Sequence, residues 1–287
     1  MSITEQRITN TIFIRVLVDN TVLHEGLAGE HGLSIFIETN KGDVLWDTGQ
    51  SEIFMENADS LGVSFENVRA IALSHGHYDH TGGINAAFDR INDAVLYAHP
   101  GIFQERFTPS SEMRKPPRSI GIQFKRETIE RMSGNTVLST KPTEILPGVF
   151  TTGEIPRLTG YEDTGGDFYL DAALTTPDPL IDDQSLVIET GDGLILILGC
   201  CHAGLINTMT FIAERWGTEK FLLVAGGMHL INADKDRIEK TIRALEKFSV
   251  DTFAPGHCTG KQALNAFTKM FPDRTSPLYT GWEWKLD

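Results

Sequence analysis

Short apolar stretches alternate with amphipathic ones along the chain, which is the pattern of a mixed α/β protein. The first half holds apolar runs of strand length, bounded by turn residues or by helical spacing: 11–18, 34–39, 44–46 and 69–73. A helix is predicted over about 52–61, because Gly62 follows as a stop signal. A second helix is predicted over 84–91, where the apolar residues again follow helical spacing.

The second half of the chain repeats this pattern. Residues 185–190 match 34–39, a glycine-bearing turn follows in both copies, and 194–198 match the returning strand. Helical spacing at 205–216 then matches the first predicted helix. Two copies of one unit predict two lobes, each a sheet with helices on its outer face, that pack sheet against sheet as a four-layer αββα sandwich. A chance match between two common strand–helix patterns is the alternative, and it leaves the α/β class unchanged.

Two segments have no counterpart in the repeat, and we interpret them as insertions in a single domain that covers 1–287. They span about 101–147 and 154–183. We expect them to cover the functional site, because loops at sheet ends carry function. The first segment has an excess of basic residues, and three of them are candidate substrate-binding residues for a phosphate or carboxylate: Arg114, Lys115 and Arg118. A solvated loop is the alternative for this segment.

Composition narrows the class of partner. The net charge of −14 disfavours nucleic acid and anionic membranes, because both repel an acidic chain. No apolar run reaches the length of a membrane span, and the first residues lack a secretory pattern, so we expect a cytoplasmic protein. The three cysteines form no spaced framework, so disulfides are not expected. The expected partner is a small anionic molecule, and a homo-oligomer is compatible with the sequence.

The densest chemistry lies between the strand at 69–73 and the helix that follows it. Three histidines and an aspartate fall within six residues: His75, His77, Asp79 and His80. Imidazole and carboxylate donors suit zinc, iron or manganese. In an extended segment His75 and His77 point the same way, whereas Asp79 and His80 follow at the turn and can face a second position. Four donors so close together indicate two adjacent metals rather than a solvated loop that happens to hold histidines.

Further candidates are scattered over the rest of the chain. His202 and His257 each follow an apolar strand, so both can reach the rim that the two sheets share. Asp47 ends a strand in the same way. His229 follows a glycine pair at the position equivalent to the histidine-rich turn in the first half. It can be a ligand, a substrate hydrogen-bond donor, a general acid or a structural residue, and His31 is a weaker candidate for substrate binding.

The pattern His-x-His-x-Asp-His after a buried strand resembles the signature of the metallo-β-lactamase superfamily. The resemblance implies an αββα sandwich with one or two metals where the sheets meet. Three strings, GCCHAGLINT, GGMHL and PGHCTG, are similar to the branch typified by dihydropterin-6-yl-methyl-(ribofuranosyl)aminobenzene phosphate synthase. The chain departs from many hydrolases of the superfamily, because it has no histidine between residues 100 and 201 and no obvious aspartate to bridge the metals.

The resemblance implies two transition-metal ions, with zinc preferred and iron or manganese as alternatives. The expected ligands form two sets: His75, His77 and His202 for one metal, and Asp79, His80 and His257 for the other. Asp47 is expected to support the site by hydrogen bonding to a ligand. The bridging ligand stays open between Cys200, Cys201 and a water.

These features predict a binuclear metal-dependent hydrolase. Two adjacent metals lower the pKa of a bound water to about 7, so a metal-activated hydroxide is available to attack a small anionic ester, phosphoester or lactone. Asp79 and His229 are the candidate catalytic residues for proton transfer. The alternatives are a transferase of the branch named above, acting on a pterin pyrophosphate, and a member that binds metal or ligand without turnover.

Overall fold

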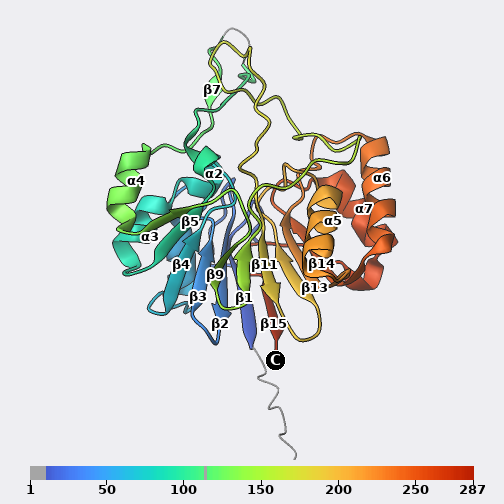
Figure 1. Ribbon diagram of the computed structural model, residues 1–287, viewed down its shortest axis with the longest axis horizontal. Coiled ribbons are helices and arrows are strands. Elements are labelled where there is room, and N and C mark those ends of the chain that lie inside the picture. The colour runs from blue at the N-terminus through green and yellow to red at the C-terminus, as the bar shows by residue number, and fades with distance from the viewer. Residues whose placement is uncertain (1–10, 113–114) are drawn as a thin grey trace, which may run out of the picture.

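The computed structural model describes residues 11–112 and 115–287, and two sheets pack face to face at its centre (Figure 1). The first sheet has the strand order β15 (Glu283–Leu286), β1 (Ile12–Val18), β2 (Ser34–Thr39), β3 (Asp43–Trp46), β4 (Val68–Ala72), β5 (Val95–Ala98) and β8 (Thr136–Leu138). The second has the order β14 (Ser249–Gly256), β13 (Lys220–Gly227), β12 (Leu194–Ile197), β11 (Leu186–Glu189), β10 (Val149–Thr151) and β9 (Thr143–Leu146).

Helices cover the outer face of each sheet (Figure 1). The first sheet packs against α1 (Ile53–Ser60), α3 (Ile84–Arg90) and α4 (Arg126–Ser133). The second packs against α5 (Leu205–Trp216), α6 (Lys235–Ala244) and α7 (Lys261–Met270). The predicted αββα sandwich is therefore confirmed. None of the helices in 11–112 and 115–287 combines the length and apolarity needed to cross a membrane.

The strands are apolar on both faces because each face is covered. In β2, Ile35 and Ile37 belong to the core between the sheets, whereas Phe36 belongs to the core under the helices. In β12, Ile195 lies between the sheets and Leu196 packs under the helices of the other lobe. Burial on both faces explains why these strands appear in the sequence as continuous apolar runs.

The two halves of the chain have the same strand connections, as the repeat predicts. The hairpin of β2 and β3 is antiparallel in the first sheet, and the hairpin of β11 and β12 is antiparallel in the second. In each lobe the returning strand continues into two parallel neighbours: β4 and β5 in one, β13 and β14 in the other. Parallel neighbours place their carboxyl ends at one edge of a sheet, so each lobe presents the loops that follow these strands on one rim.

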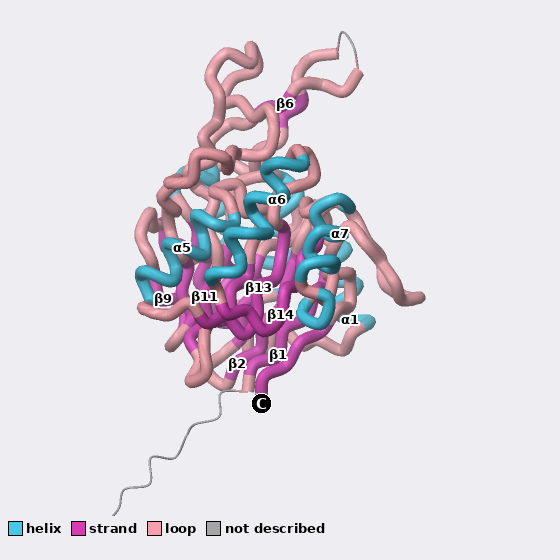
Figure 2. Tube along the Cα trace, turned by 90° about the vertical axis from the view of Figure 1, so that its right-hand side faces the viewer, coloured by secondary structure: helices cyan, strands magenta, loops and turns pink. Residues whose placement is uncertain are grey.

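The interpretation of 101–147 as one insertion is too broad. Its last part forms β8 and β9, which extend the two sheets because their apolar residues complete the edges. The hairpin of β6 (Phe107–Thr108) and β7 (Arg118–Ser119) rises beyond the rim (Figures 1 and 2). Phe107 also bridges to Tyr169, so the segment at 154–183 reaches the base of this hairpin.

Candidate metal centre

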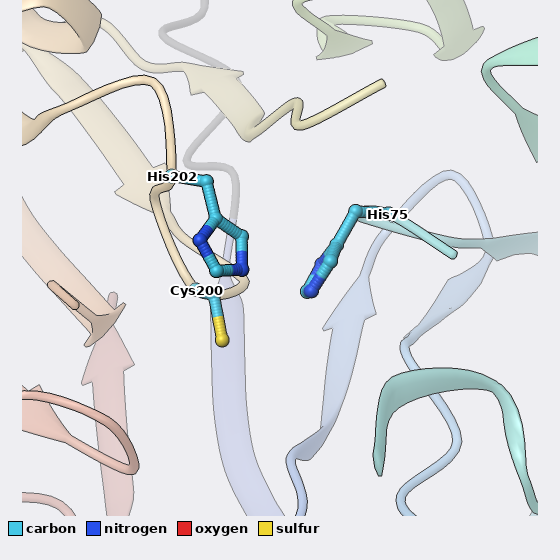
Figure 3. Close-up of side chains that lie close together, drawn as sticks. All are labelled: His75, Cys200 and His202. Atoms are coloured by element: carbon cyan, nitrogen blue, oxygen red, sulfur yellow. The ribbon is translucent and has the colours of Figure 1, made fainter. Parts of the chain in front are cut away.

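The rim between the two sheets gathers buried imidazole, thiol and carboxylate side chains. They follow β4, β12, β13 and β14: His75, His77, Asp79, His80, Cys200, His202, His229, His257 and Cys258. None of these side chains is more than 9% exposed. Figure 3 shows His75 of the first lobe opposite Cys200 and His202 of the second, whose ligand atoms all lie within 4.8 Å of one another. The structure therefore brings both predicted ligand sets to one place.

The turn after β4 is held by a buried ionic network. Gly76 lies against the carbonyl of Ile102 and the guanidinium of Arg106, so any side chain there would overlap them. The backbone N–H of Gly76 donates to Asp182 at 2.8 Å. Arg106 is fully buried, binds Asp182 at 2.5 Å and binds Asp178 at 2.8 Å. Arg106 is thus a structural residue that fixes the histidine-bearing turn.

The first ligand set consists of three neutral imidazoles. His75 Nε2 lies 2.9 Å from His77 Nδ1, and the ring of His202 is centred 4.9 Å from His75 and 5.0 Å from His77. Burial lowers the pKa of all three well below the usual value. Within the described parts of the chain, the Nε2 atoms of His77 and His202 are buried and have no hydrogen-bond partner. Buried, unpartnered lone pairs on neutral imidazoles fit a metal ion.

The second ligand set packs around the first. His80 Nε2 lies 3.2 Å from His257 Nε2, and Asp79 Oδ2 lies 3.7 Å from the former and 3.5 Å from the latter. Burial alone would raise the pKa of Asp79, but His80 and His257 hold it well below its usual range. For His257, burial acts to lower the pKa, whereas Cys258 and Asp79 raise it to about 9. A cation that bound to His257 at neutral pH would therefore have to displace a proton from it.

Asp47 orients His80, a member of the second ligand set. Its Oδ2 lies 2.7 Å from His80 Nδ1 and accepts from the Ser74 hydroxyl at 2.7 Å, while Oδ1 accepts from the Ser74 N–H at 2.7 Å. This contact places the proton of His80 on Nδ1 and directs Nε2 into the cluster. The geometry suits the supporting role expected for Asp47, and its role in metal binding stays a prediction.

Cys200 lies between the two sets. Its Sγ lies 3.2 Å from His80 Nε2 and 3.3 Å from His257 Nε2, and it also groups with His75 and His202. Cys201 turns away, because its Sγ lies 3.5 Å from the hydroxyl of Thr208. Among the ligands that the sequence leaves open, the structure thus favours Cys200 as the thiol shared by both sets.

A cavity of about 170 Å³ leads from the cluster to the surface. Part of the cluster lines it, and its walls also include His31, Tyr78, Ile120 and Phe168. Arg118 lies among them with an N–H 3.3 Å from the Tyr78 hydroxyl. His31 Nε2 lies 3.2 Å from Asp79 Oδ2.

The other two basic candidates do not join this cavity. Lys115 pairs with Glu112 at 2.5 Å, both side chains are exposed, and neither lines the cavity. Arg114 lies outside the described residues. Arg118 is therefore the candidate that the structure places at the mouth.

A strap at 162–165 orients the ligands of the second lobe, and no sequence motif indicates it. The carboxylate of Glu162 accepts the N–H groups of Ile206 and Asn207 at 2.9 Å each, at the start of α5. The carbonyl of Thr164 lies 2.8 Å from His202 Nδ1, which leaves His202 Nε2 free to face the cluster. Gly165 packs directly against the ring of His229, where no larger residue would fit.

Asp183 is a buried carboxyl next to the loop that carries His202. Its Oδ2 accepts the N–H of Ala203 at 2.8 Å, and burial raises its pKa to about 6. Its position in the run 182–185 directly before β11 is the only sequence signal for it.

A family model described as the metallo-beta-lactamase superfamily matches residues 27–257, which agrees with the four-layer fold and with the ligands on its rim. The chain belongs to this superfamily, as the resemblance of its motif predicts. It is 36% identical over 262 residues to 7,8-dihydropterin-6-methyl-4-(beta-D-ribofuranosyl)-aminobenzene-5'-phosphate synthase of Methanocaldococcus jannaschii, with 88% of each chain covered.

Two solved structures extend the comparison. Tm1679, a metal-dependent hydrolase of the beta-lactamase superfamily, matches with a TM-score of 0.81 at 28% identity, over 95% of this chain and 98% of that one. Zn²⁺-bound PqqB from Methylobacterium extorquens matches with a TM-score of 0.57 at 14% identity, over 95% and 99% of the two chains. The second likeness shows the common fold alone.

Proposed function

We propose that this protein is a hydrolase that holds two transition-metal ions between its lobes and acts on a small anionic substrate. The observation that supports this most is the packing of both ligand sets around Cys200, beside a cavity that His77, Asp79 and His257 line. Zinc is the preferred metal, because it accepts imidazole, carboxylate and thiolate donors together; iron or manganese are the alternatives. When bound, the ions would polarise the substrate and acidify a water.

The protein's own contribution is to hold the donors in place. Asp47 and the carbonyl of Thr164 fix the rings of His80 and His202, so their Nε2 atoms point inward before any ion arrives. Arg106 fixes the turn that carries His75 and His77. Such preorganisation lowers the cost of assembling the site.

Arg118 and the cavity walls define the substrate. The guanidinium offers charge-assisted contacts to an anionic group at the mouth, which matters in an otherwise acidic chain. The ring of Phe168 forms an apolar wall that excludes water. A cavity of about 170 Å³ admits only a small reacting group, so a larger substrate extends outward past Arg118.

Asp79 and His31 form a route for the proton. Asp79 stays ionised, so it accepts a proton only transiently. Burial lowers the pKa of His31, although Asp79 acts to raise it, so His31 is largely neutral near pH 7. Its ring contacts Asp79 and is 55% exposed, which connects the buried carboxylate with solvent. His229, whose ring is centred 4.1 Å from that of His202, is the second candidate catalytic residue.

A transferase is the second candidate, and one observation favours it. The synthase with 36% identity matches over 88% of both chains, so the similarity extends well beyond the ligands. In this alternative the metals hold a pyrophosphate leaving group, Arg118 binds a phosphate, and the acceptor is a second organic substrate instead of water.

The experiment compares the two directly. Metal-loaded protein is incubated with phosphoesters, lactones and esters in ¹⁸O water, and separately with a pterin pyrophosphate with or without a ribofuranosylaminobenzene phosphate acceptor. Incorporation of ¹⁸O from one substrate supports the hydrolase, and a coupled product that needs both substrates supports the transferase. The absence of turnover with every substrate, despite bound metal, would leave the non-catalytic alternative.

A further inference from the structure

Two buried side chains on the rim of the second sheet belong to neither ligand set. They are His229 and Cys258, and they group with Cys200 so that one ligand atom of each lies within 4.8 Å of the others. All three side chains are buried. They follow β12, β13 and β14, which are neighbouring strands joined in parallel. This triad therefore comes from one lobe, whereas each ligand set draws on both.

The surroundings of His229 point to a missing partner. Its Nδ1 is buried and has no hydrogen-bond partner within the described ranges, although the residue is only 9% exposed. Its backbone is left-handed with φ of 42°, a conformation that is uncommon for a non-glycine residue. Gly165 packs on the ring so closely that a side chain at residue 165 would overlap it. The fold thus keeps an imidazole with one unpartnered nitrogen beside two thiols.

We infer that Cys200, His229 and Cys258 form a further metal position, which takes a borderline-soft divalent ion such as Zn²⁺ or Co²⁺. Two sulfur donors and one imidazole are a set that zinc binds while keeping a fourth position open. The same donors discriminate against Mg²⁺ and Ca²⁺, which prefer oxygen. Cys200 is shared with the two ligand sets, so its sulfur links this position to the rest of the centre.

The position also completes the internal repeat. The glycine pair before His229 ends β13, which is the counterpart of β4 in the other lobe. The histidine-rich turn follows β4, so each lobe presents metal-binding donors after the equivalent strand. The inference concerns binding alone and does not require turnover.

The test uses the full chain, stripped of metal by chelation and reloaded with Co²⁺ under reducing conditions. Bound cobalt is counted after dialysis, and absorption from thiolate-to-cobalt charge transfer is recorded. Cys258→Ser should bind one equivalent fewer than the wild type and lose part of that absorption. Cys201→Ser is the matched control, because Cys201 is an adjacent buried thiol that faces Thr208. It should match the wild type in both measurements.

Two results would overturn the inference. One is that Cys258→Ser binds as much cobalt as Cys201→Ser and shows the same charge-transfer absorption. The other is a disulfide between Cys200 and Cys258 in protein denatured without reductant, shown by thiol counting. His229→Gln provides a second variant if Cys258→Ser fails to fold, and it should lose the same equivalent. If the two ligand sets that span both lobes do not bind metal, His77→Ala will leave the cobalt count unchanged. That outcome is distinguishable from a failure of the present inference.

Discussion

The two lobes contribute to the metal centre in different ways. In the first lobe, four donors fall within residues 75–80, on a single turn after β4. In the second lobe, the donors are spread over three loops between residues 200 and 258. A compact turn sets the relative placement of its ligands through one short piece of backbone. A dispersed set depends on the sheet to bring its members together, and on the strap at 162–165 to aim them.

The largest expected effect comes from the compact turn. His77→Ala removes a buried donor whose Nε2 has no other partner among the described residues. We expect loss of most of one metal equivalent and a fall in kcat/KM on the order of a hundredfold or more. Elemental analysis and steady-state kinetics measure both. His24→Ala is the control, because His24 packs on Tyr279 and belongs neither to the cluster nor to the walls of the cavity. Unchanged metal content in His77→Ala would refute the ligand assignment.

Removing the contact by which Asp47 supports His80 should lower metal binding less than removing a ligand does. Asp47→Asn keeps the size of the side chain but removes the charged acceptor that fixes His80. Metal affinity should fall about 10- to 100-fold, as measured by competition with a chelator. Activity should recover when metal is added in excess, because the donors remain. Wild-type affinity in this variant would mean that the turn is rigid without Asp47.

The second lobe should show its own pH dependence. Burial raises the pKa of Asp183 from 3.8 to about 6, so the folded protein binds this proton more tightly than the unfolded chain. The protonated Asp183 carboxyl therefore adds to the free energy of unfolding below pH 3.8, and this contribution is lost as the pH rises through 6. In metal-free protein, Asp183→Asn should flatten this loss, which amounts to about 3 kcal/mol in the free energy of unfolding.

Urea denaturation at several pH values measures this effect of Asp183→Asn. Asp192→Asn, in the exposed turn after β11, is the control and should follow the wild-type curve. Parallel pH profiles for wild type and Asp183→Asn would show that this carboxyl is not the cause.

The smallest effect is expected at the hairpin of β6 and β7, which lies outside the cluster of candidate ligands. Arg118→Ala should raise KM for a phosphorylated or carboxylated substrate about tenfold, because an exposed charge-assisted contact lies at the low end of its range. It should leave metal content and KM for a neutral ester unchanged. Lys115→Ala is the matched control, since Lys115 pairs with Glu112 and does not line the cavity. Equal changes on charged and neutral substrates would mean that Arg118 only solvates the hairpin.

The contrast between the compact turn of the first lobe and the dispersed donors of the second also explains which parts of the site could be predicted from the sequence. The turn at 75–80 was recognisable because its donors are adjacent and follow a buried strand. The two sheets were predictable because the hairpins of 34–46 and 185–197 have the same pattern of apolar residues. Cys200 and Cys201 could not be told apart, because alternation ends with the strand and the loop turns at Cys201, where φ is 63°.

Contacts between distant segments left no trace in the sequence. Arg106 is one of several basic residues in its segment, and its burial depends on Asp178, 72 residues away. The carbonyl of Thr164 acts through the backbone, which any residue could supply. The sequence does not separate β8 and β9 from the insertion at 101–147, because both strands are short and β8 pairs with β5, which lies far from it along the chain.

The most direct test of a centre shared by the lobes is anomalous X-ray diffraction from zinc-loaded crystals, recorded on both sides of the zinc absorption edge. The account predicts one peak contacted by His75, His77 and His202, and another contacted by Asp79, His80 and His257. Each of these sets contains residues of both lobes. No peak at the rim, or no peak contacted by residues of both lobes, would contradict it.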